Sequence, residues 1–174
     1  TSVAPRVARW NGTSWTPVGA WSGPAVHALA AFDDGTGTAL FAGHDEGVSK
    51  WDGTNWSPVA SAPSARVNAL AVFDSGQGTE LVAAGTFSQL GAVFLRNVAA
   101  WNGTSWRQLR TGLDGAAWAL QVLDDGAGPQ LYAGGDDALV GATPTIFGLA
   151  RWDGHGWNAV PGCPVKRVRA LALH

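Results

Sequence analysis

Scarce and missing residues set the first limits on this sequence. Cys163 is the single cysteine, so no intrachain disulfide can form and the fold must depend on packing. Methionine is absent, and a chain beginning at Thr1 is expected to be a processed product or a piece of a longer protein. Helical periodicity is missing as well, and the 24 glycines are spread throughout the chain. These absences point to β structure without disulfide support.

Charge and long apolar runs are also scarce. Charged residues make up 14% of the chain, the net charge is -2, and Lys166, Arg167 and Arg169 form the basic cluster. Such a chain has no general field for the phosphates of nucleic acid. No apolar run approaches the roughly 20 residues of a membrane-spanning helix. We therefore expect neither nucleic-acid binding nor a membrane span, while 46% hydrophobic residues predict a packed core.

Tryptophan, in contrast, is abundant and regularly placed. A phrase of the form Trp-Asn/Asp-Gly-x-x-Trp occurs four times and contains eight of the ten tryptophans. Consecutive phrases begin 41, 50 and 51 residues apart, a period typical of a solenoid or a propeller. The four pairs are Trp10 and Trp15, Trp51 and Trp56, Trp101 and Trp106, and Trp152 and Trp157.

The copy between Val67 and Leu109 contains four strand-like runs. The first two, 67–73 and 80–84, are separated by a Gly-rich turn, and the last two flank the reversal Asn102-Gly103. Asn-Gly and Asp-Gly between apolar segments are strong hairpin signals. Four antiparallel strands in a unit of this length predict a β-propeller blade.

The same unit maps onto residues 1–174, which we interpret as one propeller segment. Residues 6–18 supply only the third and fourth strands of a blade, and residues 167–174 supply only a first strand. The predicted fold is therefore an all-β partial propeller, with incomplete blades at both termini. Because an open arc would expose apolar blade faces, we expect completion by the remainder of a larger propeller or by a homo-oligomer, with closure into a defective four-bladed ring as the other possibility. Complete blades are predicted at 26–59, 67–109 and 117–160.

The order of these signals resembles that of Kelch-type blades. An aromatic-Ala-Gly-Gly strand end, as in 131–135, is followed by the Trp-Asp/Asn-Gly hairpin and by the second Trp. The chain is most similar in character to the Trp-rich, Kelch-like repeats of large bacterial secreted or surface proteins. This resemblance implies a binding or scaffold module at a secreted or cell-surface location, and it carries over no catalytic residue.

The paired tryptophans have two interpretations. Exposed indoles could stack on sugars, but rings at the same two positions of every unit are typical of structural packing. We therefore predict that all eight pack between blades, where each would bury roughly 150 to 250 Å².

Function is expected where the repeats differ. One equivalent position near the start of each first strand holds His27, Asn68, Trp118 and Arg169. In a propeller the first strand lines the central channel, so these four side chains, the quartet, are predicted to ring its mouth. A mixed polar and aromatic set suits a small polar ligand or a partner loop, while drift at solvated positions is the alternative.

The connections between second and third strands also vary. The first is short, whereas the next two are longer and contain apolar residues, which indicate a lid over a neighbouring blade or a contact surface. Trp21, outside the repeated frame, is a candidate to join them. The apolar loop residues are Phe87, Leu90, Val93, Phe94 and Leu95 in one loop, and Leu139, Val140, Ile146 and Phe147 in the other.

Motifs for chemistry are not evident. Acidic pairs such as Asp33-Asp34 and Asp45-Glu46 lack the spacing of a calcium loop and fit turn hydrogen bonding, and the four histidines lack zinc spacing. We expect no metal, no cofactor and no catalytic residue. The main hypothesis is a non-catalytic propeller module for a glycan or protein ligand. The alternatives are a structural fragment of a larger repeat protein and part of a propeller enzyme.

Overall fold

The computed structural model of the chain describes residues 6–59, 66–74, 76–90, 93–124, 126, 128–136, 139–140, 148–160, 162–163 and 166–172. Every regular element within these ranges is a β-strand, as the turn-rich sequence predicts. No helix that could cross a membrane occurs in this part of the chain.

Three four-stranded antiparallel sheets form the body of the molecule, and each pairs its strands in the order first, second, third, fourth. This is the predicted blade, and the all-β partial propeller is confirmed. The first blade consists of β3 (Val26–Asp33), β4 (Thr38–His44), β5 (Gly47–Trp51) and β6 (Trp56–Pro58). The second consists of β7 (Val67–Asp74), β8 (Thr79–Gly85), β11 (Val98–Trp101) and β12 (Trp106–Gln108). The third consists of β13 (Ala117–Asp124), β14 (Pro129–Gly135), β15 (Leu149–Trp152) and β16 (Trp157–Ala159).

Two short hairpins accompany the blades. The N-terminal hairpin joins β1 (Ala8–Trp10) to β2 (Trp15–Pro17). The other pairs β9 (Gln89–Leu90) with β10 (Val93–Phe94), within the long connection of the second blade. The N-terminal hairpin corresponds to the third and fourth strands of a blade, because Trp10 lies opposite Trp15 as Trp51 lies opposite Trp56.

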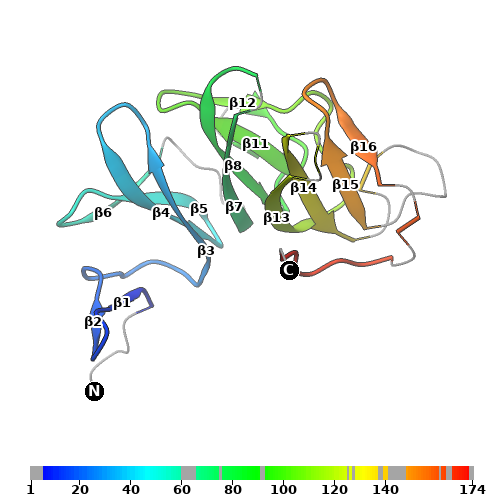
Figure 1. The fold of residues 1–174 in the computed structure, drawn as a ribbon. Helices are drawn as coiled ribbons and strands as arrows, with labels where there is room; N and C mark the ends of the chain where they lie inside the picture. Colours follow the sequence, from blue (N-terminus) through cyan, green and yellow to red (C-terminus); the bar gives the residue numbers. More distant parts are fainter. Residues whose placement is uncertain are drawn as a thin grey trace.

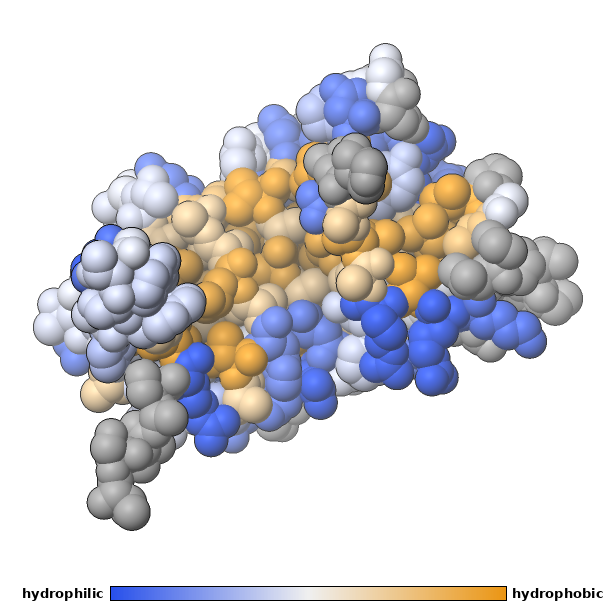
Figure 2. Space-filling view, turned by 60° about the horizontal axis from the view of Figure 1, so that its bottom comes forward, coloured by the Kyte–Doolittle hydropathy of each residue, from blue (hydrophilic) through white to orange (hydrophobic). Residues whose placement is uncertain are grey.

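The blades form an open arc (Figure 1). Their first strands β3, β7 and β13 lie side by side on the inner side of the arc, and the hairpin β1–β2 lies beyond the first blade. The ring is not closed. A hydrophobic band crosses the inner side between two hydrophilic margins (Figure 2).

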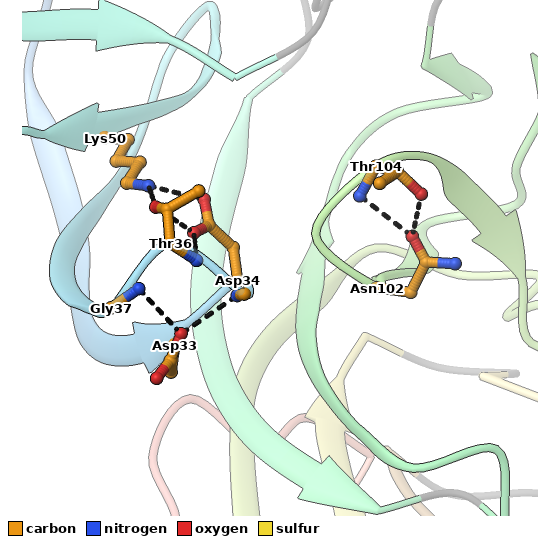
Figure 3. A network of polar contacts seen from close by, with 8 residues as sticks. Asp33, Asp34, Thr36, Gly37, Lys50, Asn102 and Thr104 are labelled. Atoms are coloured by element: carbon orange, nitrogen blue, oxygen red, sulfur yellow. Dashed lines mark hydrogen bonds and ion pairs between the residues drawn. The ribbon is translucent and has the colours of Figure 1, made fainter.

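Acidic and amide side chains build the turn that follows the first strand of each blade and the turn of each tryptophan hairpin. Asp33 Oδ1 accepts hydrogen bonds from the backbone N–H groups of Gly35 and Gly37, at 2.9 and 3.0 Å (Figure 3). Asp74 and Asp124 repeat this arrangement in the other blades. The aspartates are thus accounted for by turn hydrogen bonding, as the sequence indicates.

Two hydrophobic cores lie between successive blades. The core between the first and second blades contains Phe41 of β4 together with Trp101 and Trp106. The core between the second and third blades contains Val82 of β8 together with Trp152 and Trp157. The tryptophan pairs of the second and third blades therefore pack toward the preceding blade.

The C-terminal segment follows the first-strand path without forming a strand. Val168 N donates a hydrogen bond to Gly135 O at 2.9 Å. A Cβ atom on Gly134 would lie 2.6 Å from Val168, much as one on Gly43 would lie 2.7 Å from Val67. Val168 therefore occupies the Val67 position, but no second strand in the described residues pairs with this segment.

Candidate binding site at the inner end of the blades

A β-bulge marks the variable position of every complete blade. The pairing register between first and second strands shifts at His27, at Asn68 and at Trp118. A bulge disrupts the ladder locally and redirects the side chain of the extra residue. The three residues thereby share one irregular position in the ladder, a feature that no sequence pattern revealed.

His27 and Asn68 are connected through two charged residues from adjoining segments. His27 Nε2 lies 2.7 Å from Oδ1 of Asp45, the residue directly after β4. This hydrogen bond holds the pKa of Asp45 below its usual value. Arg66 Nε lies 3.7 Å from the same carboxylate and donates to Asn68 Oδ1 at 2.8 Å. Asn68 also donates to Ala117 O at 2.8 Å, which ties the second blade to the third.

Trp118 and Arg169 form the other half of the site. The guanidinium carbon of Arg169 lies 4.1 Å from the centre of the Trp118 ring, and that of Arg66 lies 5.8 Å away. Both are cation–π distances. A continuous chain of contacts therefore joins His27, through Asp45 and Arg66, to Asn68, Trp118 and Arg169.

The charged residues around this site have different kinds of partner. Asp45 faces Arg66, and Asp136 forms an ion pair with Arg167 at 2.8 Å. Arg169 is exposed and stacks on an indole. A guanidinium group carries its N–H donors in a planar fork, which can bind a carboxylate through two parallel hydrogen bonds. The site has the chemistry to hold an anionic group.

Next to the site, His44 is a buried and neutral histidine. Its Nδ1 accepts a hydrogen bond from Glu46 N at 3.2 Å, and its Nε2 lies 3.0 Å from Ser49 Oγ. Burial lowers the pKa of His44, and the edge of Trp21 packs against its ring at 5.3 Å. Its contacts mark it as a structural residue.

The eight motif tryptophans are placed unequally. Trp101, Trp106, Trp152 and Trp157 are buried between blades. Trp51 and Trp56 are partly buried, and Trp56 Nε1 donates to Val18 O at 2.8 Å. Trp10 and Trp15 depart from the expectation, because they are 48% and 68% exposed with no preceding blade to cover them in the described residues.

The apolar loop residues mostly extend the cores. Phe87 and Leu95 are buried in the first core and Leu139 in the second, with Val140 packed against it, whereas Phe94 is 77% exposed. Trp21 packs edge-on against Trp56 at 5.1 Å. The side chains of Leu90 and Val93, and the whole of Ile146 and Phe147, lie outside what the structure describes.

Sequence reasoning missed the two connecting residues. Asp45 was considered only as part of an acidic pair, and Arg66 precedes β7 in a linker without a motif. A signal was available, since Asp45 with Arg66 and Asp136 with Arg167 hold equivalent places, the first pair before β7 and the second before the C-terminal segment. Among the described residues, no three His, Cys, Asp or Glu side chains converge as metal ligands.

Comparison of the chain with protein-family models, curated proteins and solved structures gives no match.

Proposed function

We propose that the protein is a non-catalytic β-propeller binding module. Its ligand is an acidic protein segment, held where the first strands begin and the quartet residues lie. One observation carries the proposal: the quartet residues differ within an otherwise repeated frame, yet one chain of contacts joins them. Drift at solvated positions would not be expected to produce such a connected set.

The choice of an acidic ligand follows from the aromatic group. A sugar would need a free indole face for stacking, but the guanidinium groups of Arg169 and Arg66 lie at the Trp118 ring. A carboxylate, in contrast, would be held by the N–H groups of Arg169. The resemblance to Kelch-like repeats supports a binding role and predicts a secreted or surface location.

The test is a titration of the protein with a hexa-aspartate peptide, in which tryptophan fluorescence reports binding. Arg169→Ala is expected to weaken binding by about tenfold or more, the typical effect of losing a charge-assisted hydrogen bond. Arg96→Ala is the matched control, because Arg96 is an exposed arginine that pairs with Asp114, outside the chain of contacts that joins the quartet. Equal loss in both variants would reduce the effect to net charge. Binding of neutral glycans on an array, with no peptide binding, would favour the glycan alternative.

A further inference from the structure

The N-terminal hairpin has one unpaired edge. In every complete blade the third strand is paired on both sides, as β5 is with β4 and β6, whereas β1 pairs with β2 alone among the described strands. Val18 N donates to Val7 O at 3.0 Å, as Val59 N donates to Val48 O at 2.8 Å. Since hydrogen-bonding direction alternates along a strand, the backbone groups of Ala8 and Trp10 point to the free edge.

A cavity of about 480 Å³ lies between this hairpin and the first blade. Val7, Arg9 and Val18 line it on the hairpin side, and Leu29, Leu40 and Trp51 line it on the blade side.

The blade side of the cavity consists of residues that the other blades use in their cores. Leu70, Leu81 and Trp101 take the equivalent places in the first core, and Leu120, Leu131 and Trp152 do so in the second. Leu81 and Leu131 are fully buried, whereas the equivalent Leu40 is only partly buried. Leu29 is 48% exposed, whereas its equivalents Leu70 and Leu120 are partly buried. The cavity is therefore the counterpart of an interblade core from which the preceding blade's contribution is missing.

The complete interfaces show what that contribution is. Phe41 fills the first core and Val82 fills the second, and both come from second strands. Phe41 lies opposite Lys50, and Val82 lies opposite Ala100. In a strand added to β1, the residue in the register of Phe41 and Val82 would lie opposite Arg9, which lines the cavity.

We infer that the free edge of β1 and the cavity beside it accept an added β-strand whose sequence follows that of the second strands. The pattern is Leu, then Phe, Val or Tyr, then Ala, then Gly or Ala, as in 40–43, 81–84 and 131–134. Main-chain hydrogen bonds to Ala8 and Trp10 would give affinity, and the apolar residue entering the cavity would give specificity. A folded second copy of this chain is a poor donor, because its three second strands are each paired on both sides.

The experiment uses a fluorescein-labelled peptide with the sequence of residues 129–135, Pro-Gln-Leu-Tyr-Ala-Gly-Gly, flanked by lysines for solubility. Fluorescence anisotropy is followed as the whole protein is added. The control peptide has aspartate in place of the tyrosine, which removes the apolar residue, and proline in place of the alanine that follows it, which removes a donor facing Ala8. We expect saturable binding of the first peptide and binding about tenfold weaker or worse for the second. Equal binding of the two peptides, or no binding of either, would overturn the inference.

Two variants locate the binding. Ala8→Pro removes an edge donor, and Leu29→Asp puts a charge in the cavity; each is expected to weaken peptide binding about tenfold. Phe94→Asp is the matched control for the second, because Phe94 is 77% exposed on a different hairpin. Circular dichroism checks that all three remain folded. Peptide binding that persists in both variants would contradict the assigned site. Sedimentation that shows the protein to be a dimer, dissociated by Leu29→Asp and not by the other variants, would mean that a second copy of the chain occupies the site instead of an added strand.

Discussion

The third blade and the N-terminal hairpin contain the same motif in opposite surroundings. Trp152 and Trp157 are 4% and 5% exposed, whereas Trp10 and Trp15 are 48% and 68% exposed. Yet the ring centres lie 5.6 Å apart in the first pair and 5.5 Å in the second. The hairpin alone sets the separation of the two rings, although their planes cross at 63° in the first pair and 45° in the second, and the preceding blade decides whether the pair is buried. A repeated motif therefore does not imply a repeated contribution to stability.

The largest expected effect is on the tryptophans themselves. Trp152→Ala should lower the free energy of unfolding by about 3 to 5 kcal/mol, because it empties a filled interblade core. Trp15→Ala should change it by less than about 0.5 kcal/mol, because the ring is mostly in solvent. Urea denaturation of both variants measures the difference. Similar losses would show that the hairpin is covered in solution.

Ion pairs of the second and first blades also differ in how deeply they are buried. In the second blade Arg107 Nε donates at 2.7 Å to Glu80, which is 1% exposed, and Arg107 Nη2 bonds the second carboxylate oxygen. Arg107→Met should destabilise the protein by about 3 kcal/mol, because the carboxylate stays buried without the guanidinium. In the first blade Lys50→Met should cost only about 1 kcal/mol, since the side chain of Asp34 is 10% exposed, against 2% for Glu80, and keeps its hydrogen bonds from Thr36. Thermal unfolding of the two variants ranks them, and a reversed order would refute this account.

Equivalent hairpin glycines provide a third comparison. Gly53 and Gly103 have φ values of +100° and +99°, so alanine is strained at either position. A Cβ atom on Gly53 would meet nothing within 4 Å, whereas one on Gly103 would lie 2.3 Å from Asp34 O, in the adjoining turn of the first blade. We expect Gly53→Ala to cost about 1 kcal/mol and Gly103→Ala about 2 kcal/mol or more. Figure 3 shows the two turns that approach here. Equal costs in denaturant titration would mean that the turns do not touch in solution.

The smallest effect concerns pH. Burial raises the pKa of Asp34, but hydrogen bonds from Lys50 and Thr36 and the charge of Lys50 outweigh it, and the net pKa lies below 3.8. A carboxylate with a lowered folded-state pKa stabilises the protein above its unfolded pKa, and this stability is lost as pH falls through the folded pKa. The difference in unfolding free energy between the wild type and Lys50→Met should therefore be constant near neutral pH and shrink below about pH 4. A difference independent of pH would assign the effect of Lys50 to packing.

The sequence predicted the strands well and the site in part. Short apolar runs, a Gly-rich turn and the Asn-Gly reversal placed the four strands of the second blade, because local turn chemistry acts over few residues. The quartet could be identified because the four repeats align, so that one position with a different residue in each repeat stands out. Arg66 and Asp45 were missed because they meet only when segments 21 residues apart are folded together. The bulges at His27, Asn68 and Trp118 were missed because the residues carry no common signature.

The sequence by itself determined the unit of this protein: a four-stranded blade, its turns and the pairing of its tryptophans, all of which arise from contacts within one repeat. Tertiary structure alone decided which tryptophans are buried, where the charged chain at the inner ends runs and that β1 keeps a free edge. The reason is physical, since burial and ion pairing between blades depend on the neighbour that a blade meets, and identical repeats meet different neighbours.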